Sequence, residues 1–319
     1  MIKFLLKNLL FSIPFIILFI SGLFFLPTTL ESNNMLYASK AKRERLKSIT
    51  SPKIVFIGGS SIAFGLDSKI IEEQLGYPVV NMGLHAEIGL HYMVLETLPY
   101  LKKGDIVIIA AEYEQFDNQT FYGGEVLPPL LFDIHNDYET LDLTSTIRLF
   151  PDIANYNLKK VRGFLSYNQP NQKTSVNLDK PTVYAKKSFN KYGDMTAHWN
   201  LESPKQEISN AKHNNNKKIS NNVITFLLDF KQKMDIKGVK TLFVPPPYKK
   251  TLFNKETEYI TNIDARLKKE GLGYITTPSK YTFPDSLFFD TSYHLNKKGV
   301  DKRTKYLIED ISNYINNQK

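Results

Sequence analysis

Three short apolar runs, each followed by turn residues, limit what this chain can fold into. They are KIVFIG at 53–58, YPVVNMG at 77–83 and GDIVIIAAE at 104–112. Their length and their content of Val and Ile favour strands that are buried on both faces. The segments between them, 68–76 and 90–98, carry apolar residues at helical spacing. This order of strand, helix, strand, helix, strand predicts right-handed βαβ units in a parallel sheet.

The alternation stops after Glu112 and resumes near residue 223. Residues 113–215 are rich in aromatic residues and Asn and show no sustained period, so we interpret them as a long insertion after the third strand. Helical spacing returns near 223–234, 255–270 and 297–315. We therefore expect an α/β fold with three layers, α/β/α, around a five-stranded parallel sheet. The expected strands lie near 53–58, 78–82, 105–111, 240–245 and 273–276.

The N-terminus carries an uncharged apolar stretch from Asn8 to Leu30, which is long enough to cross a bilayer. We interpret residues 1–30 as a transmembrane signal anchor, 31–52 as a basic connector and 53–319 as one domain that contains the insertion 113–215. Charge does not settle the orientation: Lys3 and Lys7 favour a cytoplasmic N-terminus, whereas KAKRERLK at 40–47 argues the opposite way.

Composition narrows the chemistry. The chain has no cysteine, which excludes disulfides, thiolate catalysis and cysteine-bound metals. A net charge of +9 suits an anionic neighbour or merely scattered surface lysines. The turn at 58–65 does not match a phosphate-binding loop, because Leu66 stands where the lysine would be, nor a dinucleotide motif, because Ser60 replaces the second glycine. We expect no cofactor, no metal and no nucleic-acid partner.

Chemically useful residues follow the predicted strands. Ligands of parallel sheets bind at the carboxyl ends of the strands, so these residues are expected to converge. A serine, glycine amides, a histidine and a carboxylate are what nucleophilic catalysis needs. The other interpretation is a strand-to-helix turn with a capping serine. The residues at the strand ends are Ser60 and Ser61, Gly83, Glu112 and Tyr113, Tyr248, and the pair Asp290 and His294.

These residues, in this order, resemble the SGNH (GDSL-like) hydrolase superfamily, which has a flavodoxin-like α/β/α fold. IGGSS matches the first block, with Gly59 in place of its aspartate. The resemblance implies that Ser60 is the nucleophile, with Ser61 as the fallback. NMG matches the second block, and DTSYHLNKKG the last. The resemblance further implies that the amides of Ser60 and Gly83 form the oxyanion hole, that His294 is the base and that Asp290 is its partner.

Two departures from the family pattern stand out. Glu112 lies where the third block has an oxyanion-hole asparagine, and an ionised glutamate only accepts hydrogen bonds. The last block is D-x-x-x-H, one residue longer than usual. Further substrate contacts are expected from residues near the strand ends and in the insertion: Glu112, Tyr113, Tyr248 and His198.

The resemblance implies an enzyme, a membrane-anchored esterase or O-acyltransferase. The expected substrate is a cell-surface polysaccharide carrying O-acetyl groups, and the expected partners are the membrane and a membrane-bound O-acyltransferase. The catalytic domain would then lie outside the cytoplasm. Two alternatives remain open: a non-catalytic protein that binds polysaccharide or scaffolds an assembly complex, and a cytoplasmic-facing hydrolase of lipid esters.

Overall fold

The computed structural model describes residues 2–167, 183–204 and 218–317, and it divides the chain into two compact units. Unit 1 combines Met1–Ser32 with Gly124–Thr182, and unit 2 combines Asn33–Gly123 with Val183–Lys319. This division differs from the predicted one. Most of the expected connector belongs to unit 2, and the expected insertion is shared between the units, with residues 168–182 and 205–215 outside the described part.

Unit 2 is built on a parallel sheet with the strand order β2-β1-β3-β4. This is the flavodoxin-like order for the first four strands. The predicted fifth strand is wrong. Residues 273–276 reach the sheet through one bond from the Ile275 amide to the Phe243 carbonyl, 2.9 Å, and form no ladder between Gly273 and Pro278. The strands are β1 (Ile54–Gly58), β2 (Val79–Asn81), β3 (Ile106–Ala110) and β4 (Lys240–Phe243).

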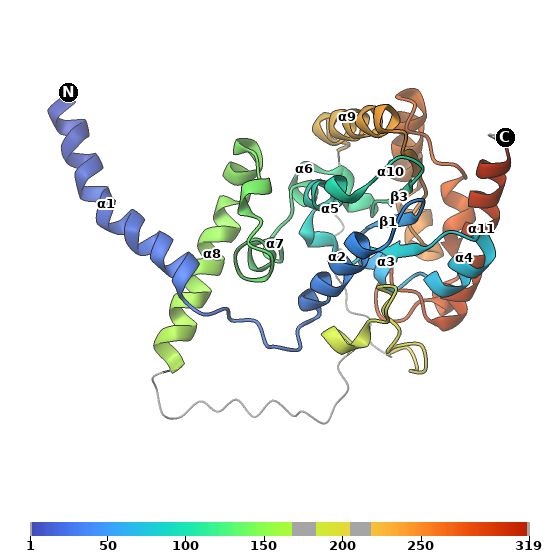
Figure 1. Ribbon diagram of the computed structural model, residues 1–319, viewed down its shortest axis with the longest axis horizontal. Helices are drawn as coiled ribbons and strands as arrows, with labels where there is room; N and C mark the ends of the chain where they lie inside the picture. The colour runs from blue at the N-terminus through green and yellow to red at the C-terminus, as the bar shows by residue number, and fades with distance from the viewer. Residues whose placement is uncertain (1, 168–182, 205–217, 318–319) are drawn as a thin grey trace. The chain divides into compact units, whose positions relative to one another are not determined.

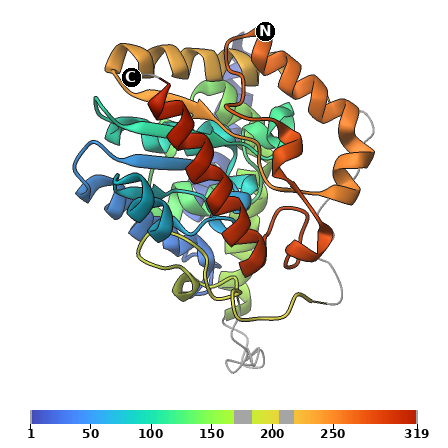
Figure 2. The same ribbon diagram turned by 90° about the vertical axis from the view of Figure 1, so that its right-hand side faces the viewer.

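Helices cover both faces of this sheet, which gives the expected three layers (Figure 1). On one face, Phe56, Ile108 and Leu242 form a core with α4 (Ser68–Leu75) and α11 (Lys297–Asn316). Figure 2 shows α11, in red, in front of the strands. The alternate side chains point to the opposite face. There α5 packs on β1 and α9 packs on β4. These two helices are Leu90–Thr97 and Asn221–Lys237.

The basic run predicted as a connector is a helix packed onto the domain, α2 (Ala38–Ser48). Lys42 is buried and donates to the carbonyls of Asn81, at 3.0 Å, and Gly193. Arg43 pairs with Glu96 at 2.9 Å. Because these cations bind protein groups, this run is not a free basic linker.

The rest of unit 2 consists of short elements and one long helix. A second, two-stranded parallel sheet, formed by β5 and β6, packs against α10. The elements are α3 (Ser60–Ala63), α6 (Asn118–Phe121), β5 (Tyr248–Lys249), α10 (Lys250–Lys269) and β6 (Thr282–Phe283).

Unit 1 pairs α1 (Ile2–Phe25) with α8 (Leu143–Tyr167), and the short α7 (Leu127–Pro129) also contacts α8. Asn157 donates to the Phe19 carbonyl at 2.8 Å, and Lys160 donates to the Leu23 carbonyl at 2.7 Å. In the described part of the chain, no helix has both the length and the apolar character needed to cross a membrane. The transmembrane segment predicted at 1–30 is therefore not supported.

Candidate active site

The turn after β1 presents one serine and hides the next. Gly59 is the N-cap of α3, which begins at Ser60. Ser60 is partly exposed, whereas Ser61 is fully buried. Of the two candidate nucleophiles, only Ser60 can therefore meet a substrate without unfolding the turn.

Close packing explains why this turn contains two glycines. A Cβ at Gly58 would lie 2.6 Å from the Ala110 carbonyl oxygen of the neighbouring strand. A Cβ at Gly59 would lie 2.7 Å from Glu112 Oε1 and 2.9 Å from Ala86 Cα. Real Cβ atoms essentially never approach so closely, so the glycines let β3 and its following residues lie against the serine turn.

The pair Asp290 and His294 is formed despite its unusual spacing. The His294 Nδ1 atom lies 2.8 Å from Asp290 Oδ1. The loop between them folds back, because Thr291 Oγ1 accepts from the Tyr293 and His294 amides at 3.2 and 3.1 Å. The Phe289 amide also donates to the His294 carbonyl at 2.7 Å. This bend brings the two side chains together within D-x-x-x-H.

Tyr184 is a second hydrogen-bond donor to the Asp290 carboxylate. Its hydroxyl donates to Asp290 Oδ2 at 2.5 Å and lies 3.2 Å from His294 Nδ1. Burial alone would raise the pKa of Asp290, but the bonds from His294 and Tyr184 outweigh burial and lower the pKa. Since a carboxylate only accepts, Nδ1 of His294 is the donor to Asp290, which makes Nε2 the ring atom that can act as a base.

His294 lies beside the serine helix without bonding to Ser60. Its ring stacks on Phe64, with centroids 3.9 Å apart and planes 5° apart. The Phe64 amide in turn donates to the Ser60 carbonyl at 2.8 Å. The Ser60 hydroxyl donates to Glu112 Oε1 at 3.2 Å, and within the described ranges no hydrogen bond joins Ser60 to His294. The structure thus brings the candidate base and the candidate nucleophile into one region, with Glu112 holding the hydroxyl.

Gly83 has a different role from the one expected. Its amide donates to Asn81 Oδ1 at 2.9 Å, so it is not a free oxyanion donor here. A Cβ at Gly83 would lie 2.5 Å from Ile62 Cβ. The glycine lets the loop after β2 pack directly on α3.

The residues expected to contact substrate are buried. Glu112 is 4% exposed, and Tyr113, Tyr248 and His198 are fully buried. Tyr113 and Tyr248 pack edge to face with ring centroids 5.2 Å apart. His198 Nε2 lies 2.9 Å from the Leu295 carbonyl oxygen. Burial lowers the pKa of His198 to about 4, so this ring is neutral near pH 7. These three aromatic side chains are therefore part of the packed interior of the domain.

Two residues of the aperiodic insertion, Tyr184 and Asp194, were not among the expected site residues. Asp194 is fully buried and accepts from the Ser68 hydroxyl at 2.5 Å and from Asn81 Nδ2 at 2.8 Å. It therefore fastens residues 190–195 to the start of α4 and the end of β2. No motif marks either residue; only their proximity to strand ends in the fold reveals them.

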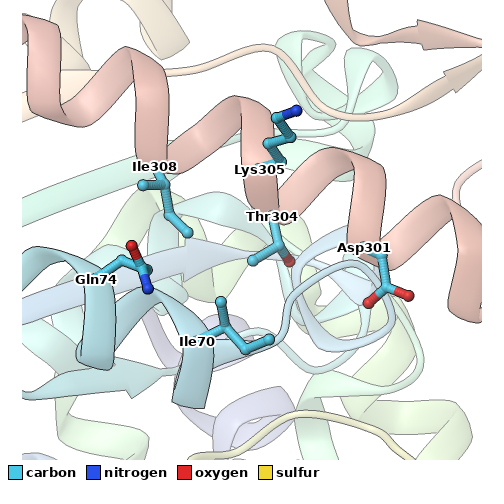
Figure 3. Close-up of a pocket in the computed structure, with 6 residues that line it drawn as sticks. All are labelled: Ile70, Gln74, Asp301, Thr304, Lys305 and Ile308. Atoms are coloured by element: carbon cyan, nitrogen blue, oxygen red, sulfur yellow. The ribbon is translucent and has the colours of Figure 1, made fainter.

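One cavity lies away from these residues. It has a volume of about 360 Å³ and opens between α4 and α11, where Ile70 of α4 lies opposite Ile308 and Thr304 of α11 (Figure 3). None of the six lining residues belongs to the serine turn or to the Asp290–His294 loop. In the residues that the structure describes, no cluster of three or more His, Asp or Glu side chains could hold a metal ion.

Comparison with known proteins adds little to this geometry. No family model matches the chain, and no curated protein matches it. Among solved structures, the chain is similar to a protein described as lipolytic, of the G-D-S-L family, from Desulfitobacterium hafniense DCB-2. That match has 11% identity and a TM-score of 0.35, and covers 82% of this chain and 99% of the other. A structure from Streptococcus pneumoniae described as a platelet activating factor has 13% identity and a TM-score of 0.29, with 87% and 90% covered.

Proposed function

We propose that the chain is a serine esterase or acyltransferase that works through an acyl-Ser60 intermediate. The observation that carries this proposal is the partly exposed Ser60 at the carboxyl end of β1, beside a His294 ring that Asp290 holds through Nδ1. Nε2, the other ring nitrogen, would then act as the general base. Apo enzymes often show long catalytic hydrogen bonds, which tighten when substrate binds.

The reaction would proceed in two balanced steps. First, Nε2 of His294 takes the Ser60 proton as Oγ attacks the ester carbonyl, and the imidazolium returns that proton to the departing alcohol. Second, His294 takes a proton from water or from a sugar hydroxyl, which attacks the acyl-serine and restores the Ser60 hydroxyl. Water gives hydrolysis, and a sugar hydroxyl gives acyl transfer.

Hydrolysis of a small acetyl ester tests this proposal. Ser60→Ala and His294→Ala should each abolish turnover, and their effects should not add, because the two residues act as a unit. Ser61→Ala is the matched control: its hydroxyl is fully buried and out of reach of a substrate, so activity should persist. If activity survives in Ser60→Ala and vanishes in Ser61→Ala, the nucleophile is Ser61 and the proposed role of Ser60 is wrong.

One observation favours the alternative of a non-catalytic polysaccharide-binding protein. The Ser60 hydroxyl bonds to Glu112 rather than to His294. If substitution of Ser60, Ser61 or His294 does not change ester hydrolysis, and a column of the immobilised protein retains polysaccharide, then the binding role replaces the catalytic one.

We also propose a surface polysaccharide as the acyl acceptor or donor, a membrane-bound O-acyltransferase as partner and an extracytoplasmic location. The resemblance to anchored members of the superfamily supports this proposal. Unit 1 supports membrane association, because large apolar side chains of α1 are exposed, among them Phe11 at 73% and Phe25 at 81%. Protease added to intact cells should cleave unit 2, and complete protection until lysis would reverse the location.

A further inference from the structure

Glu112 occupies an unusual position for a carboxylate. It stands at the end of β3, almost fully buried, where its Oε1 accepts from the Ser61 amide at 2.8 Å and from the Ser60 hydroxyl at 3.2 Å. The missing side chain at Gly59 makes room for it, since a Cβ there would lie 2.7 Å from the same oxygen. The carboxyl therefore lies directly against the turn that carries the proposed nucleophile.

Oε1 accepts both bonds from the serine turn, and the Gln115 amide bonds to the same carboxyl in a capping box. Because Oε1 already accepts twice, a proton on this carboxyl resides on Oε2. We propose that protonated Glu112 donates a hydrogen bond from Oε2 to the oxyanion formed at Ser60, in place of the asparagine that the family resemblance implies at this strand end. This inference rests on the proposed acyl-serine function. It makes Glu112 the third oxyanion-hole donor, although an ionised Glu112 would repel the oxyanion.

Electrostatics explains why the protonation state decides the role. An ionised carboxylate next to an oxyanion repels it, and in a buried site that repulsion is strong. A neutral carboxylic acid instead stabilises the developing charge without giving up its proton. Glu112 would thus help catalysis when protonated and hinder it when ionised.

The surroundings of Glu112 are compatible with a neutral carboxyl. Burial is the main cause that raises the pKa of Glu112, to about 7, and the nearby charge of Glu114 adds to it, while the bonds from Ser61 and Ser60 lower it. On the α11 side, buried Arg303 donates to the Ser61 carbonyl at 2.5 Å, and its charge favours the ionised form. The Tyr293 hydroxyl, which donates to Glu114 at 2.5 Å, also interacts electrostatically with Glu112.

Ester hydrolysis as a function of pH, from about pH 5 to about pH 9, separates this role from others. We use p-nitrophenyl acetate as substrate and a fluorophosphonate probe to label Ser60. In the wild type, kcat/KM should fall as pH rises through about 7, because Glu112 ionises there. Glu112→Gln keeps a donor that cannot ionise, so it should retain activity within about threefold and lose the alkaline decline. Glu112→Ala should lose about 100-fold.

The control is Glu309→Gln, which removes an exposed glutamate of α11 and should leave the wild-type profile unchanged. A Glu112→Gln profile that still declines above pH 7 overturns the role of Glu112. Loss of Glu112→Gln activity at every pH overturns it too and makes Glu112 the base for Ser60. If Glu112→Gln does not fold, the wild-type profile decides, because an alkaline plateau contradicts the proposal. A wild type that neither hydrolyses the ester nor is labelled at Ser60 overturns the proposed function as well.

Discussion

The buried ion pair between Lys53 and Asp105 should contribute strongly to stability and not to activity. Each residue directly precedes a central strand, so the pair lies at the amino ends of β1 and β3, opposite the edge that carries Ser60. The Nζ–Oδ2 distance is 2.9 Å, and the two side chains are 1% and 0% exposed. Removing one partner of such a pair leaves the other charge buried without compensation.

The contacts of the two residues make the expected losses unequal. After Asp105→Asn, Lys53 Nζ has no counter-charge, because the amide and its other acceptors, the Tyr100 carbonyl at 3.1 Å and the Ser51 hydroxyl at 3.4 Å, are all neutral. This change should cost about 3–5 kcal/mol. After Lys53→Met, Asp105 still accepts from the amides of residues 53 and 102, at 3.0 and 2.8 Å. That variant should cost less, about 1.5–3 kcal/mol. The double variant should cost less than the sum of the two.

Urea unfolding followed by tryptophan fluorescence measures these losses. Trp199 is the only tryptophan of the chain and belongs to unit 2, so the signal reports on the sheet domain alone. With an m-value of about 3 kcal/mol/M, Asp105→Asn should lower the midpoint by about 1 M or more. Ester hydrolysis without urea should stay at the wild-type level. A loss below about 1 kcal/mol, or a larger loss for Lys53→Met, would refute this reasoning.

Three further outcomes are expected. Tyr184→Phe removes a donor from Asp290, so kcat should fall about tenfold with little change in KM, and an unchanged kcat would deny Tyr184 a positioning role. Burial lowers the pKa of Lys42 from 10.5 to about 7, so the unfolded chain binds more protons between these values and stability should increase with pH there, by about 1.4 kcal/mol per unit. Lys42→Met should remove that increase. If the stability of the wild type and of Lys42→Met, measured by urea unfolding, rises equally with pH, Lys42 is not its cause. Phe11→Asp should weaken flotation with phospholipid vesicles, unlike Ile236→Asp in unit 2, and equal effects would argue against a membrane face on α1.

The sequence analysis placed candidate residues at predicted strand ends, but it could not find residues whose position depends on tertiary packing. Ser60 follows the end of β1, and the Asp290–His294 pair precedes the start of α11, so both could be located from the predicted elements. Gly83 matched a motif, but motif matching cannot show that Asn81 takes its amide. Tyr184 could not be found, because an aperiodic segment gives no indication of which side chain returns to the sheet.

The fold shows the same division. The apolar runs determined the central strands, since a buried parallel strand needs little beyond length and β-branched residues. The prediction of a fifth strand was wrong: residues 273–276 lie between glycines and a proline and make one hydrogen bond to the sheet, which is not enough for a strand. The run KAKRERLK was misinterpreted because charge normally indicates solvent, whereas its Lys42 and Arg43 find carbonyl and carboxylate partners inside the domain.

The pairing of α1 with α8 determines how the protein can be shortened. A truncated form that starts at Asn33 would keep all of unit 2 but would remove the carbonyls of Phe19 and Leu23, which Asn157 and Lys160 now bind. Lys160 would then retain only Asp133, at 2.9 Å, as its charged partner. Aggregation of such a form would reflect an orphaned α8 rather than an unstable sheet domain. A version limited to unit 2 therefore requires two excisions, residues 1–32 and 124–182.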